Sequence, residues 1–233
     1  MNQILVYIAA AVLPAAVLMY YVYKKDTIEK EPLDLLGKLI LGGCLAGVLS
    51  GFLEQIGITV LNSLVSPSHP FYVILLAFLV VAVIEEGTKF FFMQRRTWRN
   101  PHFNFCFDGI VYAVFVSLGF AALENIGYVM GYGLAVAPTR AILSIPAHMG
   151  FAVFMGYFYG RGKRWHLLGN DAKARRERIF GYILAVFLHG FYDACAMTGT
   201  TYATAVFFVF VVIMDIAVLY TVKKGSKEDE PLL

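Results

Sequence analysis

Two adjacent carboxyls, Glu85 and Glu86, lie inside the apolar stretch Phe71–Met93, and Lys89 follows one helical turn later. On insertion scales, each such charge costs roughly 2.5–3.5 kcal/mol at the centre of a membrane-spanning helix. Lys89 is at i+4 from Glu85 and i+3 from Glu86, so one ammonium must serve two acids. We therefore expect one carboxyl to stay charged and the other to hold a proton, which is the pairing that a general base and its proton donor need.

Further acids and histidines interrupt the other apolar stretches. His189 and Asp193 are at i and i+4, the spacing at which two ligands share a metal ion or an acid orients an imidazole. At about 1.5 Å per residue from the outer ends of the predicted helices, Glu85, Glu124, His148 and His189 all lie between the membrane midplane and its outer half. We therefore expect one shared site. Two more acids, Glu54 and Asp215, stand alone in their stretches and are expected to be protonated or hydrogen-bonded structural residues.

Long apolar segments must position these side chains. The chain has 233 residues, of which 59% are hydrophobic and 15% charged, and its mean hydropathy is +0.69. A soluble domain is about 25% charged, so the composition predicts an all-α, polytopic membrane bundle formed by residues 1–233 as a single domain. A span needs about 20 residues, and seven segments qualify. They are Ile4–Tyr23, Gly37–Leu61, Phe71–Met93, Phe107–Met130, Ala141–Gly160, Ile179–Met197 and Tyr202–Val222.

Basic residues alternate between the connections of these spans. Seventeen of the 19 Lys and Arg residues fall in the first, third and fifth loops and in the tail 223–233, if Lys38 at the helix entry after the first loop is included, whereas the fourth connection holds only Arg140. This pattern places the N-terminus outside and the C-terminus in the cytosol. The first segment is read as a retained span rather than a signal peptide. The basic loop 161–178 is expected to bind anionic lipid headgroups of the bilayer, and no nucleic-acid partner is expected.

Several motifs occur in a fixed order along the chain. Glu85-Glu86-Gly87-Thr88-Lys89 matches EExxK, the segment from Phe120 to Glu124 matches FxxxE, and His189-Gly190-Phe191-Tyr192-Asp193 follows His148. With Asp108-Gly109 and the Glu124-Asn125 pair, this order resembles the PrsW family of intramembrane proteases, over roughly residues 4–222. The related CAAX prenyl endopeptidases carry a histidine at the position of Glu124 and an asparagine at that of Asp193.

The resemblance implies a multi-pass protease of the bacterial cell membrane. Its substrate would be a single-pass membrane protein, an anti-sigma factor, cut at site 1 to begin a stress-response cascade of regulated intramembrane proteolysis. By matching position, Glu85 would be the base that activates water, Glu86 its partner, and His189 a polarising group or a ligand. Lys89 and Asn125 would support them.

Two chemistries stay open for this site. A Zn²⁺ ion held by His148, His189 and either Glu124 or Asp193 would activate water with Glu85 as base. Without a metal, Glu85 would be the base and His189 the oxyanion donor. Other functions also stay open: a hydrolase of the prenyl-peptidase type with another substrate, or a proton- or ion-coupled transporter. An inverted repeat, which many transporters contain, is not visible in the sequence.

Overall fold

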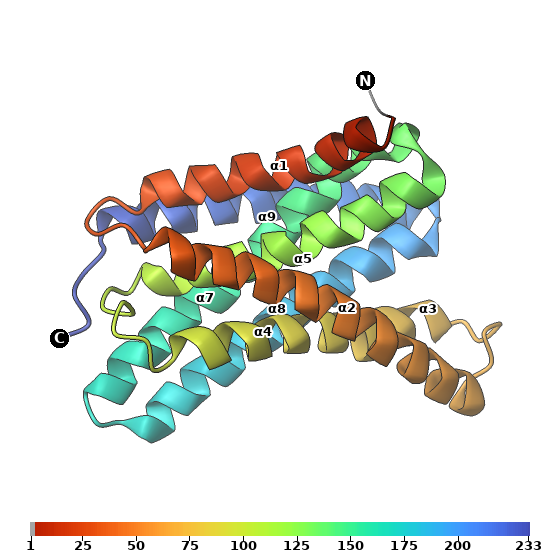
Figure 1. The fold of residues 1–233 in the computed structure, drawn as a ribbon. Helices are drawn as coiled ribbons and strands as arrows, with labels where there is room; N and C mark the ends of the chain where they lie inside the picture. The colour runs from red at the N-terminus through yellow and green to blue at the C-terminus, as the bar shows by residue number, and fades with distance from the viewer. Residues whose placement is uncertain (1–2) are drawn as a thin grey trace.

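The computed structural model describes residues 3–233, which form a bundle of long helices (Figure 1). In chain order the elements are α1 (Gln3–Lys25), α2 (Leu33–Leu64), α3 (Tyr72–Leu75), η1 (Leu76–Ala82), α4 (Val83–Thr97), α5 (Asp108–Tyr132), η2 (Leu134–Val136), α6 (Ala137–Thr139), η3 (Arg140–Ser144), α7 (Ile145–Leu167), α8 (Asp171–Thr198) and α9 (Thr201–Lys227). Within these residues the single β contact is an isolated bridge between Phe105 and Pro231. The predicted all-α membrane bundle is confirmed.

Six helical stretches in the described chain are long and apolar enough to cross a membrane. They contain α1, α2, α5, α7, α8 and α9, and the fourth of them runs from Leu134 to Leu167 because α6 and η3 lead directly into α7. The predicted span Phe71–Met93 is also helical. It is built from α3, η1 and α4 in succession, with the π-helical segment η1 in its middle. This continuous helical segment is less apolar than the other six because α4 carries Glu85, Glu86 and Lys89. These three charged residues belong to the site.

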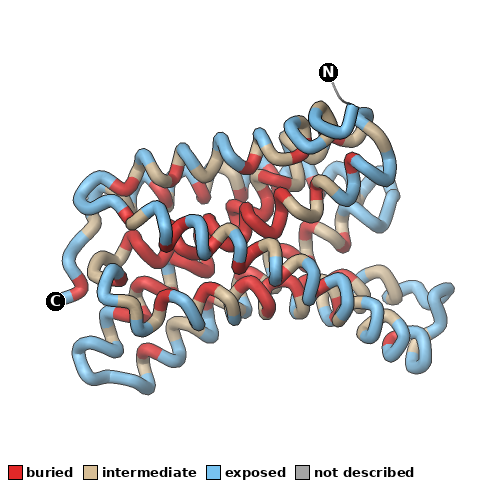
Figure 2. The backbone as a smooth tube through the Cα atoms, viewed as in Figure 1, coloured by how far each residue is buried: buried red, intermediate tan, exposed pale blue. Residues whose placement is uncertain are grey.

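Helix α5 lies at the centre of the bundle, between α1, α2 and α7, and most of its residues are buried (Figure 2). Glycines let α7 approach the start of α5 closely. A Cβ atom at Gly156 would lie 2.4 Å from the carbonyl oxygen of Gly109, and one at Gly160 would lie 2.2 Å from that of Cys106. Small residues of this kind let membrane helices pack backbone to backbone. Because α5 carries Glu124 and α7 carries His148, this contact fixes the distance between two site residues.

Helices α1, α4, α7 and α9 end on the same side of the bundle, on the left in Figure 1. Their last turns carry basic residues, among them Lys24, Arg95, Arg164 and Lys224, and we call this side the basic end. The N-terminus lies at the opposite end (Figure 1). The loops that the sequence groups by charge therefore lie together, and the assignment of the basic end to the cytosol stays a prediction.

The C-terminal tail returns to the connection between α4 and α5. The backbone N–H of Leu232 donates to the carbonyl oxygen of Asn104 at 2.8 Å, and that of Cys106 donates to Glu230 at 3.3 Å. Asp229 accepts a hydrogen bond from the backbone N–H of Phe107 at 2.9 Å. The side chain of Leu232 is buried. These contacts join the end of the chain to the start of the central helix.

Candidate active site

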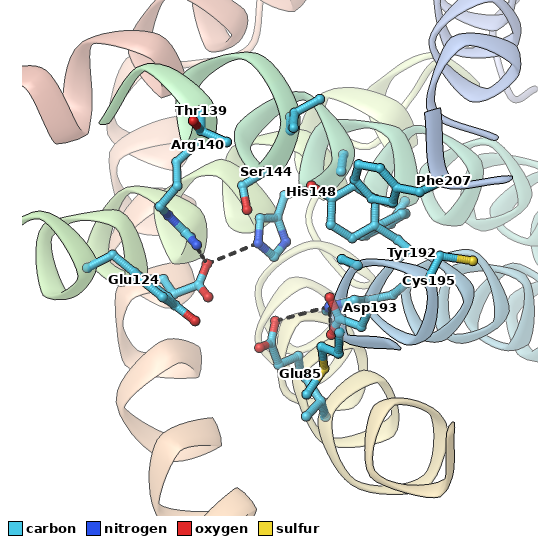
Figure 3. A pocket seen from close by; sticks show the side chains of 18 of the residues that line it. Glu85, Glu124, Thr139, Arg140, Ser144, His148, Tyr192, Asp193, Cys195 and Phe207 are labelled. Atoms are coloured by element: carbon cyan, nitrogen blue, oxygen red, sulfur yellow. Dashed lines mark hydrogen bonds and ion pairs between the residues drawn. The ribbon is translucent and has the colours of Figure 1, made fainter. Parts of the chain in front are cut away.

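A cavity of about 580 Å³ opens among α2, α4, α5, α7, α8 and α9, and most of the predicted site residues line it (Figure 3). Its polar wall consists of Glu54, Glu85, Glu124, Arg140, His148, His189 and Asp193. Aromatic side chains, including Phe151, Tyr192 and Phe207, form the rest of the lining. The cavity thus combines convergent titratable groups with an apolar surface, as expected of an enzyme site that takes an apolar substrate segment.

The adjacent carboxyls Glu85 and Glu86 have different environments. Lys89 Nζ donates to Glu85 Oε2 at 3.0 Å and to Glu86 Oε1 at 2.8 Å. Glu86 is fully buried behind the cavity wall, where its Oε1 also accepts a hydrogen bond from His189 Nδ1 at 2.8 Å. Glu85 lines the cavity instead. Of the two acids, Glu85 is therefore the one whose carboxylate can meet water and substrate.

His189 is held on one face of its ring and at both nitrogens. Its Nδ1 bonds to Glu86, and its ring stacks on Phe151 with centroids 4.8 Å apart. Its Nε2 lies 3.3 Å from Asp193 Oδ2 and 3.9 Å from Glu85 Oε2. Glu86 thus holds Nδ1, and Nε2 is directed toward the cavity. Histidines that bind metals or polarise substrates are commonly oriented in this way by a carboxylate.

The opposite wall is an ion pair completed by a histidine. Glu124 Oε2 accepts from Arg140 Nη2 at 2.7 Å and lies 3.1 Å from His148 Nε2. Lys89 Nζ lies 3.2 Å from His148 Nδ1. An ammonium group only donates, so Nδ1 must accept and Nε2 must carry the proton that bonds to Glu124. Lys89 also lies 4.0 Å from the ring centroid of Phe120, the aromatic residue of the FxxxE motif.

Two residues of the site were not predicted from the sequence. Arg140 Nε donates to Asn125 Oδ1 at 2.8 Å, and its guanidinium lies 3.8 Å from the ring centroid of Tyr128. Asn125 in turn donates to the carbonyl oxygen of Ala11 at 2.8 Å. The signal for Arg140 was its position as the lone basic residue of a connection that otherwise carries no positive charge. Glu54, expected to be structural, lines the cavity from α2.

The structure thus brings together the residues that the motifs single out, namely Glu85, Glu86, Lys89, Glu124, Asn125, His148, His189 and Asp193. Asp215 does not line this cavity. Asp108 lies at the basic end, where its Oδ2 accepts from the backbone N–H groups of Asn104 and Phe105 at 3.0 and 2.7 Å. It therefore stabilises the turn before α5.

The donor set fits a divalent cation. Across residues 3–233, one group of three has ligand atoms that all lie within 4.8 Å of one another: Glu85, Glu86 and His148. Glu86 Oε2 is buried without a hydrogen-bond partner. Carboxylates and imidazoles are the ligands of catalytic zinc sites. Lys89 contacts the same three residues, which places its ammonium among them. This group differs from the predicted ligands His148, His189, Glu124 and Asp193, and that set stays a prediction.

Comparison with known proteins identifies the chain. The sequence profile of the PrsW family of intramembrane metalloproteases matches residues 31–220. The chain belongs to this family. It is 33% identical over 208 residues to Protease PrsW of Clostridioides difficile strain 630, covering 88% of this chain and 84% of that protein. It is 35% identical over 187 residues to Protease PrsW of Geobacillus kaustophilus strain HTA426, covering 80% and 77% of the two chains.

A third PrsW protease, that of Bacillus subtilis strain 168, is 31% identical over 205 residues, covering 87% of this chain and 89% of the relative. No solved structure matches the chain. As a PrsW family member with six apolar helices of membrane-spanning length among the described residues, the protein is a peptidase of the bacterial cell membrane. The transporter alternative is thereby set aside.

Proposed function

We propose that this PrsW protease hydrolyses a peptide bond of a single-pass membrane protein, an anti-sigma factor, as the site-1 cut of regulated intramembrane proteolysis. The observation that carries the proposal is the cavity-facing position of Glu85, opposite His189 Nε2 and backed by the buried Glu86. The cavity is formed by helices of membrane-spanning length, which supports a substrate segment that arrives within the bilayer.

The residues of the cavity suggest how each proton moves. Glu85 takes a proton from a water molecule whose oxygen attacks the scissile carbonyl carbon. Both nitrogens of His189 face carboxylates, so the ring carries a proton on each, and Nε2–H donates to the developing oxyanion. The carbon–nitrogen bond then breaks, and Glu85 returns the proton to the leaving amine. Asn125 accepts a hydrogen bond from Arg140, and Arg140 holds Glu124 and thereby His148 on the facing wall.

We further propose that the family's metal is zinc here. The ion would be held by His148 and His189 with Glu124 or Asp193, or by the closer group of Glu85, Glu86 and His148. When bound, zinc acidifies a coordinated water and polarises the carbonyl group. The excess of acids supports a cation at the site, because five carboxyls (Glu54, Glu85, Glu86, Glu124 and Asp193) face two permanently basic side chains, Lys89 and Arg140.

A cleavage assay with purified protein tests the assignment of substrate and base. The protein is reconstituted with the anti-sigma factors of the host, and with unrelated single-pass proteins as a comparison. We expect Glu85→Ala and His189→Ala to abolish cleavage, while Asp215→Asn, an intramembrane acid away from the cavity, cuts normally. Normal cutting by both active-site variants would overturn the mechanism. Cleavage of the unrelated proteins alone would overturn the proposed substrate.

Metal content decides between the two chemistries. We expect purified protein to contain about one zinc per chain, activity to disappear on chelation, and zinc to restore it. Loss of bound metal in His189→Ala together with retention in Glu86→Gln would support the predicted ligand set. Retention in His189→Ala together with loss in Glu86→Gln would support Glu85, Glu86 and His148. His148→Ala should lose the metal in either case, because His148 belongs to both sets. Full activity after complete metal removal would establish the metal-free mechanism.

A further inference from the structure

A second cavity, of about 670 Å³, lies at the basic end between α5, α7, α8 and α9, and it shares no lining residue with the active site. Its floor is apolar and aromatic. Ile110, Phe154, Phe180 and Leu184 line it, and Tyr157 and Tyr220 border it. Phe180 and Tyr220 are 51% and 63% exposed, so the cavity opens on the outer surface of the bundle. The proposed catalytic steps make no use of this cavity.

The rim of this second cavity is basic. Arg161, Arg164 and Lys224 line it together with one acid, Glu228. Each cation has a carboxylate partner: Arg161 pairs with Glu177 at 3.0 Å, Arg164 with Glu230 at 3.0 Å, and Lys224 with Glu228 at 3.8 Å. The three basic side chains are 43–50% exposed. Exposed ion pairs contribute little net stability, so a better-placed anion can replace these carboxylates.

We propose that this cavity binds an anionic phospholipid. The phosphate of the headgroup would lie among Arg161, Arg164 and Lys224, and an acyl chain would run along Phe154, Phe180 and Leu184. Basic pockets between membrane helices at the charged side of a bundle recognise acidic headgroups. The aromatic rim residues Tyr157 and Tyr220 are of the type that prefers the headgroup level of a bilayer.

The lining favours a lipid over a free phosphate ion. Most of the lining residues are aromatic or aliphatic, and an inorganic anion would leave that surface uncovered. The charge of the lining favours an acidic lipid over a zwitterionic one, since three cations and one carboxylate face the cavity. Headgroup charge and acyl-chain contact should therefore both be required, and each can be removed separately.

Native mass spectrometry of the detergent-purified full chain tests the proposal. Dioleoylphosphatidylglycerol and dioleoylphosphatidylcholine are added separately, and the bound lipid per protein is counted. We expect wild-type protein to retain phosphatidylglycerol at least fivefold better than phosphatidylcholine. The triple variant Arg161→Gln, Arg164→Gln, Lys224→Gln should lose this preference. The control Arg95→Gln, Arg96→Gln removes exposed basic residues of the same end outside the cavity, and it should keep the preference.

Two further arms separate the possible ligands. Leu184→Trp fills the apolar floor without changing charge, and it should reduce phosphatidylglycerol retention at least threefold. Inorganic phosphate at millimolar concentration should not displace the lipid. Equal retention of the two lipids, or equal loss in the triple variant and its control, would overturn the proposal. Displacement by phosphate together with unchanged binding to Leu184→Trp would instead show a simple anion site. If the triple variant fails to fold, Lys224→Gln alone provides the same comparison.

Discussion

Glu85 and Glu86 are neighbours in the sequence, but their carboxyl groups have separate surroundings. Lys89 contacts both, as its spacing predicts, yet only Glu86 gains His189 as a second partner, and only Glu85 lines the cavity. A buried acid with two cationic or polar partners holds a structure in place, whereas an acid at a cavity wall can exchange protons with a substrate water. The two residues should therefore fail in different ways when their charge is removed.

Glu85→Gln should lower the cleavage rate about 100- to 10,000-fold, the usual contribution of a general base, with little change in melting temperature. Glu86→Gln, by contrast, should lower the free energy of unfolding by about 3 kcal/mol, because the fully buried carboxylate partner of Lys89 and His189 is lost. Cleavage kinetics and thermal unfolding in detergent measure the two effects. A melting temperature that falls more in Glu85→Gln than in Glu86→Gln would contradict this division.

Arg140 is expected to act as a positioning residue. Its guanidinium holds Glu124 and Asn125 at once, so Arg140→Gln should lower kcat about 10- to 100-fold and leave KM nearly unchanged. Arg140→Lys should recover only part of the loss, because an ammonium cannot reproduce the planar fork of two donors. Arg99→Gln, an exposed arginine at the basic end, is the control. A change confined to KM would instead indicate that Arg140 binds substrate.

At the scale of elements, each wall of the site has one residue on a helix that follows a π-helical segment, Glu85 on one wall and His148 on the other. Segment η1 ends at Ala82, three residues before Glu85, and η3 begins with Arg140 and ends one residue before α7, the helix of His148. A π-segment inserts a residue into the helical register and turns all later side chains around the axis, and such segments are frequent at functional sites. Here they precede Glu85 and His148, two of the residues that face the cavity.

The close contact of α5 and α7 gives a prediction for the elements themselves. Gly156→Ala would place a Cβ atom 2.4 Å from the backbone oxygen of Gly109, so the helices must separate. We expect a loss of about 1–3 kcal/mol and reduced cleavage, because Glu124 and His148 move apart. Gly127→Ala on α5, where no atom lies within 4 Å, should be neutral or slightly stabilising. Thermal unfolding and cleavage assays of the two variants measure these effects. Equal melting temperatures and equal cleavage rates for the two variants would contradict the prediction.

Hydropathy and residue spacing predict the membrane spans and most residues of the site, but they do not predict the π-helical segments or the tertiary contacts. The spans and the acids and histidines of the motifs can be predicted, because burying charge in lipid is so costly that intramembrane charges mark a site. The π-segments cannot be predicted, since an apolar run such as Leu76–Ala82 reads the same in either helical register. Arg140 and Glu54 reach the cavity only through tertiary packing. The spacing within the EExxK motif predicts the contact of Lys89 with Glu86, but it carries no information about the second partner of Glu86, which is His189 on another helix.

For the whole molecule, buried acids at the basic end predict a pH-dependent stability. Burial raises the pKa of Glu31 to about 7, with Asp26 adding to the effect and a hydrogen bond from Tyr112 opposing it. Burial likewise raises the pKa of Asp26 to about 6, against the charge of Lys30. The folded protein holds these protons at a pH where the unfolded chain has released them. The contribution of Glu31 to the free energy of unfolding is therefore most favourable below about pH 4.5, and this advantage is lost as the pH rises to about 7.

Thermal unfolding in detergent between pH 5 and pH 8 measures this dependence. Glu31→Gln keeps an acceptor for the Tyr112 hydroxyl and removes the titration, so its melting temperature should fall less over this range and exceed that of the wild type at pH 8. Glu29→Gln changes an exposed acid of the same loop and should keep the wild-type slope. Parallel curves for wild type and Glu31→Gln would show that Glu31 does not set the dependence.

The returning tail has a consequence for biosynthesis. Leu232, one residue from the end of the chain, is buried and bonded to Asn104, and Ser226 bonds to the carbonyl oxygen of Lys25 at the end of α1. These partners are synthesised well before residues 226–232. The junction between α1, the start of α5 and the tail can therefore form only after residues 226–232 have emerged, so a nascent chain that stalls before them would lie in the membrane with this junction unformed.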